Sequence, residues 1–295
     1  MSRIRRRFEQ ILEPAGIRLD GSDPWDIQVH NPDLFMRIVR EGTLGLGEAY
    51  MDGWWDCEAL DQMITRGFRA GLEDKVRNNL RFLAYLMGCR MFNRQSRARA
   101  FQVGEQHYDI GNDVFEQMLD PHMNYSCGFW ESAQNLAEAQ IAKMEMICAK
   151  LQLEPGMKVL DVGCGWGGLA RWMAGHHGAQ VTGVTVSVEQ AKLARDRCAD
   201  LPIDIEVRDY RELEGQFDRI VSVGMFEHVG QRNYQTFFGK TRSLLKDQGL
   251  FLLHTIGAGR DGFATDRWIE KYIFPNGVLP PAPALAPSGR DEPPQ

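Results

Sequence analysis

The sequence predicts an α/β protein in which a Rossmann-like, doubly wound parallel sheet follows a small, mainly helical domain. Short runs rich in β-branched residues alternate with helical patterns through the second half of the chain, which is typical of a parallel sheet with crossover helices. A glycine-rich turn joins the first of these runs to a helix, as in nucleotide-binding α/β domains. These two observations together point to a nucleotide-binding α/β fold.

Five strands and their helices are expected in order along the chain. The predicted strands are 158–162, 180–184, 204–207, 219–223 and 249–254, and the predicted helices include 135–151, 187–198 and 233–245. Ligands of such sheets bind beyond the carboxyl ends of the strands. Residues that follow different strands should therefore meet in one crevice, namely 161–165, Thr185, Asp209, Tyr210, 226–228 and 254–257.

The glycine turn after the first strand is the strongest local signal. Gly163 and Gly165 allow the backbone to bend sharply and to approach a ligand closely. The amides that open the next helix are expected to be unpaired donors. Gly163, Gly165 and Gly168 also fit the dinucleotide fingerprint, which on its own is compatible with a turn that binds no ligand.

The residues around this turn favour S-adenosylmethionine (SAM) over NAD. A dinucleotide site expects an acidic residue about 20 residues further on, where this chain has Thr185 and Gln190. Asp161 precedes the first glycine and can accept hydrogen bonds from the ammonium of the methionine part of SAM. The cofactor residues expected from this part of the chain are Asp161, Gly163, Cys164, Gly165, Thr185, Gln190, Asp209 and Tyr210.

Several motifs, taken in order, resemble the cyclopropane-fatty-acyl-phospholipid synthases, a family related to the mycolic acid cyclopropane synthases. They are Tyr125-Ser126-Cys127, 159–167, 184–187, 224–230, 254–257 and 272–277. The resemblance runs from about residue 17 to about residue 279, and it includes 45–55, which is similar to the small helical domain of that family. The residues beyond it do not match, so the chain resembles the family without its carboxyl-terminal region.

The resemblance implies transfer of a methylene group from SAM to the cis double bond of an unsaturated acyl chain in a membrane phospholipid. It implies that Tyr125 and Ser126 cap the SAM site. It also implies a bound bicarbonate as the catalytic base, held at the positions that match the cradle of the family, which are Cys127, Glu227, His254 and the backbone of Ile256. A fifth contributor in the family, a carboxyl-terminal tyrosine, has no counterpart here.

Simpler interpretations of these residues stay open. Cys127 could be a small buried hydrophobe, Glu227 could form a surface ion pair with His228, and His254 could be a hydrogen-bonded core histidine. Two other functions also stay open. One is a SAM-dependent methyltransferase for a different acceptor, and the other is a catalytically dead remnant that binds SAM or membrane without turnover.

The composition is typical of a cytoplasmic enzyme. The six cysteines, at positions 57, 89, 127, 148, 164 and 198, form no C-x-x-C pair, so the sequence suggests neither a metal site nor a disulfide framework. No apolar segment approaches the length needed to span a bilayer.

The chain is expected to divide into a helical accessory domain at 1–93, a methyltransferase domain at 94–276 and a disordered, proline-rich tail at 277–295. Seven basic residues and no acidic one lie between Lys75 and Arg99, with apolar residues interleaved. This pattern suits a basic amphipathic helix on an anionic membrane, or else a solvated face, whereas nucleic acid is disfavoured because no stacking motif accompanies the charge. The expected location is therefore the inner face of the cytoplasmic membrane, in peripheral association with unsaturated phospholipids.

The fifth predicted strand, 249–254, should lie at an edge of the sheet. The residues after it are proline-rich in their second half and cannot form the ladder hydrogen bonds of a central strand. An apolar, unpaired edge is an aggregation hazard, so we expect this chain to be poorly soluble and nearly inactive. Membrane contact or formation of a homodimer would cover such an edge.

Overall fold

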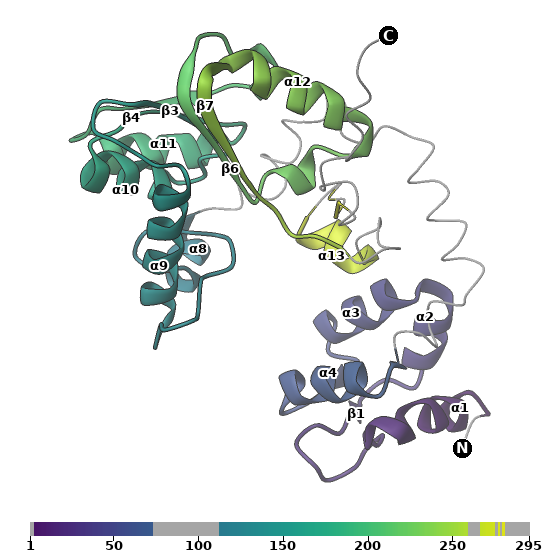
Figure 1. The fold of residues 1–295 in the computed structure, drawn as a ribbon. Coiled ribbons are helices and arrows are strands. Elements are labelled where there is room, and N and C mark those ends of the chain that lie inside the picture. Colours follow the sequence, from purple (N-terminus) through teal and green to yellow (C-terminus); the bar gives the residue numbers. More distant parts are fainter. Residues whose placement is uncertain (1–2, 73–111, 259–265, 275–276, 278, 281–295) are drawn as a thin grey trace. The chain divides into compact units, whose positions relative to one another are not determined.

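A computed structural model describes residues 3–72, 112–258, 266–274, 277 and 279–280. The chain divides into two units, Met1–Phe92 with Asp266–Ile273, and Asn93–Thr265 with Phe274–Gln295 (Figure 1). The predicted basic run between Lys75 and Arg99 and most of the predicted tail lie outside the described residues.

The larger unit contains a five-stranded parallel sheet in the order β5-β4-β3-β6-β7. The strands are β3 (Lys158–Val162), β4 (Gln180–Thr185), β5 (Ile203–Val207), β6 (Phe217–Val223) and β7 (Leu245–His254). All five predicted strands are confirmed. The order reverses direction at β3, because β4 and β5 lie on one side of it while β6 and β7 lie on the other, and this is the point where doubly wound sheets bind ligands.

The start of β7 differs from the prediction. The sequence predicts a helix that continues through Leu245 and a strand that begins at Gly249. Instead, Leu245 has an extended backbone and pairs with Phe217 of β6, so the strand begins directly after the helix. As expected, β7 occupies one end of the sheet, and in the described part of the chain it pairs only with β6.

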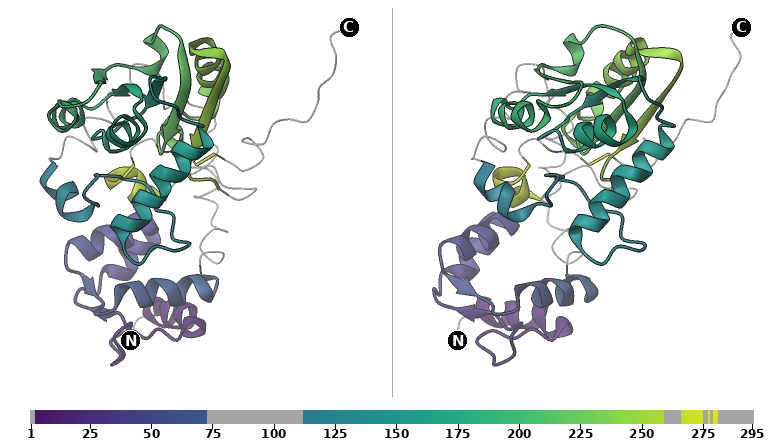
Figure 2. Two further views of the ribbon diagram at one scale, coloured as in Figure 1. Left: turned by 60° about the vertical axis from the view of Figure 1, so that its left-hand side comes forward. Right: turned by 90° about the vertical axis from the view of Figure 1, so that its left-hand side faces the viewer.

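Helices cover both faces of this sheet (Figure 2). On one face, α9 (Leu136–Lys150) and α10 (Gly168–His177) pack against β3, β4 and β6, and α11 (Val188–Cys198) lies beside α10 and packs on β4 and β5. On the other face, α12 (Tyr234–Leu244) packs against β3, β6 and β7. Successive side chains of a strand point to opposite faces, so Val159 joins the first layer and Leu160 joins the second. The short helix α8 (Asn112–Met118) precedes α9.

The smaller unit is mainly helical, as the sequence predicts. It comprises α1 (Arg3–Leu12), the 3-10 turn η1 (Glu13–Ala15), α2 (Leu34–Glu41), α3 (Thr43–Met51), α4 (Leu60–Arg69) and an antiparallel pair of short strands, β1 (Gln28–Val29) and β2 (Trp55–Asp56). Its core includes Ile17, Leu34, Ala49 and Trp55. In the described ranges of both units, no helix is long and apolar enough to cross a membrane.

One segment departs from the predicted domain division. The sequence assigns residues 94–276 to a single catalytic domain, but Asp266–Ile273 belongs to the first unit. The reason is that α13 (Arg267–Tyr272) packs on α3. Lys271 Nζ and Tyr272 Oη both bond to Glu48 Oε1, at 2.5 and 2.9 Å. These contacts join distant parts of the chain, so local sequence patterns could not reveal them.

The aromatic layer beneath α12 gives a stability prediction. Phe237 is fully buried against Phe226 and Tyr210, whereas the adjacent Phe238 is 39 % exposed. Phe237→Ala should lower the free energy of unfolding by about 3–5 kcal/mol, because it leaves a cavity in the core. Phe238→Ala is the control and should cost less. Chemical denaturation of both variants measures the difference, and equal losses would contradict this description of the core.

Candidate cofactor and active site

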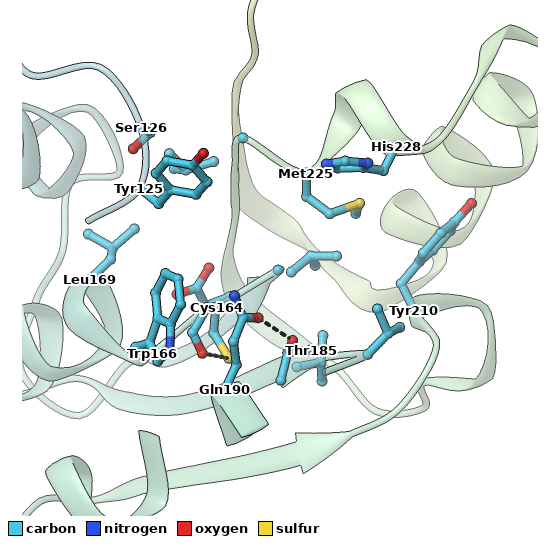
Figure 3. A pocket seen from close by; sticks show the side chains of 18 of the residues that line it. Tyr125, Ser126, Cys164, Trp166, Leu169, Thr185, Gln190, Tyr210, Met225 and His228 are labelled. Carbon is cyan, nitrogen blue, oxygen red and sulfur yellow. Dashed lines mark hydrogen bonds between the residues drawn. The ribbon is translucent and has the colours of Figure 1, made fainter. Parts of the chain in front are cut away.

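A cavity opens where β3, β4 and β6 end, at the point where the strand order reverses (Figure 3). Every residue that the sequence assigns to cofactor contact lies on its wall. These residues are Tyr125, Ser126, Asp161, Gly163, Cys164, Gly165, Thr185, Gln190, Asp209 and Tyr210. The tyrosines Tyr125 and Tyr210 stand on opposite sides of the opening (Figure 3). Residues from four separate stretches of the chain are therefore brought together in one site.

The glycine turn lines the cavity, and two of its amides are already paired. The amides of Gly163 and Cys164 both donate to the carbonyl of Val184, each at 2.9 Å, and so are not free donors. These bonds anchor the turn to β4. Gly165 has a φ of +54°, and a Cβ added there would meet no atom within 4 Å, so the backbone borders open space. This turn suits a ligand that needs acceptors better than a pyrophosphate, which needs donors.

Asp161 supplies such an acceptor. It lies in β3 directly before the turn, is 2 % exposed, and its Oδ2 atom has no hydrogen-bond partner among the described residues. Burial raises the pKa of Asp161 to about 7. A buried carboxylate without a partner is costly, and the ammonium group of a methionine-like ligand would satisfy it. The cavity therefore fits SAM.

Thr185 and Gln190 form a fixed polar pair in the wall of the cavity. The Thr185 hydroxyl donates to Gln190 Oε1 at 2.9 Å and accepts from the amide of Ser187 at 3.2 Å. Ser187 is the N-cap of α11, and its hydroxyl accepts from the Gln190 amide at 3.2 Å. Because Thr185 occupies its oxygen, the Gln190 side chain offers its NH₂ group to a ligand hydroxyl.

Asp209 is held by a residue that the sequence did not single out. Arg211 donates through Nε to Asp209 Oδ1 at 2.8 Å and through Nη2 to Asp209 Oδ2 at 2.6 Å. The guanidinium group also lies 5.3 Å from the centre of the Tyr210 ring. Arg211 therefore fixes both cofactor candidates at this end of the cavity, and two-point pairing of this kind is a particularly directional contact.

The four residues of the predicted bicarbonate cradle form two neighbouring pairs. Cys127 Sγ lies 3.5 Å from His254 Nε2, and the Ile256 amide donates to Glu227 Oε1 at 2.6 Å. Glu227 Oε2 and His254 Nδ1 are buried and have no hydrogen-bond partner in the described part of the chain. Burial, together with the positive charge of Lys143, lowers the pKa of His254, which favours its neutral form.

Phe226 was expected to reach the crevice and does not. It is fully buried and stacks on Tyr234 at 4.4 Å between ring centres. The reason is the tight 3-10 turn η4 (Phe226–His228), which directs Phe226 into the core while His228 lines the cavity.

Two further residues at the site were missed. Lys143 of α9 lines the cavity and donates to Ser126 Oγ at 2.7 Å. The available signal was a charged residue within the buried face of a predicted helix. Phe274 stacks on Tyr125 at 6.2 Å and lies 5.7 Å from His228, and it belongs to a motif to which the sequence gave no role. Within the described ranges, no group of three or more His, Cys, Asp or Glu side chains could hold a metal ion.

Comparison with known proteins bears directly on this site. Residues 95–292 match the family described as mycolic acid cyclopropane synthetase. The chain is 54 % identical over 283 residues to the cyclopropane-fatty-acyl-phospholipid synthase of Escherichia coli, covering 96 % of this chain and 74 % of that protein. It is 34 % identical to a tuberculostearic acid methyltransferase of Mycobacterium tuberculosis, covering 94 % of this chain and 69 % of that protein.

Solved structures show the same similarity. The cyclopropane synthase MmaA2 from Mycobacterium tuberculosis is 33 % identical with a TM-score of 0.57, over 63 % of this chain and 71 % of that chain. The mycolic acid cyclopropane synthase CmaA1, solved in complex with S-adenosylhomocysteine (SAH) and CTAB, is 35 % identical with a TM-score of 0.57, over 62 % of this chain and 70 % of that chain.

The raised pKa of Asp161 predicts how SAH binding depends on pH. Below its pKa of about 7 the carboxyl is neutral and cannot pair with the ammonium of the ligand. Calorimetry should therefore show the affinity falling as the pH is lowered from about 7 to about 5, by nearly tenfold for each unit below the pKa. Asp161→Asn should bind weakly and without this dependence. A variant that retains the pH profile of the wild-type protein would show that another group titrates.

Proposed function

This chain belongs to the mycolic acid cyclopropane synthetase family and is a SAM-dependent enzyme of the cyclopropane synthase type, and from that premise we propose how its site works. The reaction is the transfer of a methylene group from SAM to the cis double bond of an unsaturated phospholipid acyl chain. The observation that carries the proposal is the unpartnered Asp161 carboxyl in a cavity whose wall holds every expected cofactor residue.

The chemistry sets two requirements for the protein. SAM supplies an electrophilic methyl group, and an alkene is a weak nucleophile that must be held in line with it, away from water. The lipid gains one carbon and two hydrogens overall, so one proton of the transferred methyl group must leave before the ring closes. The protein therefore needs a fixed cofactor and a base beside it.

We infer that the base is a bicarbonate held by Cys127, Glu227, His254 and the backbone of Ile256. Two observations support this assignment. The buried atoms Glu227 Oε2 and His254 Nδ1 have no hydrogen-bond partner in the described part of the chain, and bicarbonate can both donate and accept hydrogen bonds. A neutral His254 can also donate to one oxygen through its single N–H, and its lowered pKa makes it a weak base for the substrate proton.

The lipid substrate places the enzyme at a membrane surface, and we propose peripheral association with the inner face of the cytoplasmic membrane. Supporting this, α1 has no buried residue and carries the exposed arginines Arg3, Arg6 and Arg7. Arg5 is instead paired with Glu9 and Asp20. A cationic face of this kind is attracted to anionic lipids. The basic run 75–99, which lies outside the described residues, would add to the same attraction.

A second candidate is methyl transfer without ring closure, which is suggested by the similarity to a tuberculostearic acid methyltransferase. Incubation with labelled SAM and liposomes of unsaturated phospholipid separates the two reactions. Both add the mass of one CH₂ group to the lipid, but only cyclopropane formation removes the alkene signals from the NMR spectrum of the product. Retention of an alkene would favour the second candidate.

The same assay tests the base. Glu227→Ala and His254→Ala should each reduce product formation by about 100-fold or more, because general-base catalysis typically contributes that much. Their affinity for SAH should change little, since neither side chain lines the cofactor cavity. Cys127→Ser keeps a hydrogen-bonding group and should lose less activity. If turnover and SAH affinity fall in parallel, these residues serve cofactor binding or folding instead.

A further inference from the structure

Two buried charges of opposite sign line the cofactor cavity, and no ion pair joins them in the described part of the chain. They are Asp161 and Lys143, each 2 % exposed. The only hydrogen bond of the Lys143 ammonium within the described residues is the one to Ser126 Oγ. An ammonium has three donors, so two remain to be satisfied. Unpaired buried charges are expensive, and both of these residues line the cavity, where a ligand can pair with them.

The position of Lys143 is set by two contacts between α9 and the segment that caps the cavity. Gln140 Nε2 donates to the Ser126 carbonyl at 2.8 Å, and one helical turn later Lys143 Nζ donates to the Ser126 hydroxyl. Ser126 is thus held through its backbone and its side chain by one face of α9. This arrangement fixes the ammonium beside Tyr125 and Ser126 on the cavity wall.

The acidic residue Asp120, whose charge acts on Lys143, does not pair with it. Asp120 acts on it through space, but its oxygens accept hydrogen bonds from the His122 amide at 2.9 Å and from the Asn124 amide at 2.7 Å. No ion pair between Asp120 and Lys143 occurs among the described residues. Burial accordingly lowers the pKa of Lys143 to about 8. With this pKa the ammonium is still mostly charged at neutral pH, and no anion pairs with it among the described residues.

We propose that Lys143 binds the carboxylate of the methionine part of SAM, while Asp161 binds its ammonium. The inference rests on the proposed use of SAM. An α-amino acid carries both charges on one carbon, so a cavity with one buried cation and one buried anion is complementary to it. Each charge lacks an ion-pair partner among the described residues, and each would gain one when the zwitterion binds.

Bicarbonate is the other carboxylate-like anion that could use Lys143. The charge of Lys143 does reach His254 and Cys127, which belong to the proposed bicarbonate cradle. However, Lys143 lines the cavity together with Asp161, whereas Cys127, Glu227, His254 and Ile256 are not among the described residues that line it. The location therefore favours the amino-acid carboxylate.

The test compares SAH with its carboxamide, in which a neutral amide replaces the carboxylate. Calorimetry on the wild-type protein should show at least a tenfold preference for SAH, equivalent to about 1.4 kcal/mol. Lys143→Met should remove that preference, and Asp161→Asn should weaken both ligands equally. Lys150→Met is the matched control on the same helix, because Lys150 is exposed, and it should behave like the wild-type protein.

Three results would overturn the inference. The first is equal affinity of the wild-type protein for SAH and its carboxamide. This result needs no variant, so it is decisive even if Lys143→Met does not fold. A preference for SAH that persists in Lys143→Met would also overturn the inference. So would a Lys143→Met variant with unchanged SAH affinity that requires more bicarbonate for turnover, because that result assigns the lysine to the base. Failure of the wild-type protein to bind SAH would instead contradict the proposed function.

Discussion

The site depends on the register of β3 between β4 and β6. Asp161 lies opposite Gly183 of β4 and Val221 of β6, so the three strands end at the same level. A slip of one residue would turn Asp161 to the opposite face of the sheet and separate it from the glycine turn. The Gly163 and Cys164 amides reinforce this register, because both bond to the last part of β4. The position of the ligand follows from strand pairing more than from any single side chain.

The ligand-free site carries electrostatic costs that a bound substrate and cofactor would remove. Three buried groups have unsatisfied hydrogen-bonding capacity in the described part of the chain. They are Asp161 Oδ2, the Lys143 ammonium and Glu227 Oε2. The buried carboxylate of Asp209, in contrast, is paired with Arg211. Departures from full pairing are expected at functional sites, where stability is traded for complementarity to a ligand.

Sequence patterns predicted the carboxyl ends of the strands well, because these ends depend on local composition and on turns. Asp161, Thr185 and Asp209 could be assigned to one crevice without coordinates, since each follows or ends a strand of a parallel sheet. Lys143 could not, because its role comes from a contact between α9 and Ser126 across the chain. The same holds for α13, whose attachment to α3 depends on Glu48, more than two hundred residues away.

The central claim is that the cavity at the end of β3 is the SAM site, and Gly165 tests it most directly. Its added Cβ would project into open space at a φ of +54°, so Gly165→Val should fill the cofactor position. Gly156→Val is the matched control, because Gly156 also has a positive φ, +82°, and an unobstructed Cβ position but is not among the described residues that line the cavity. Calorimetry should show SAH binding to the wild-type protein and the control, no binding to Gly165→Val, and weaker binding of NAD throughout. Unchanged SAH affinity in Gly165→Val, or tighter binding of NAD than of SAH, would contradict the account.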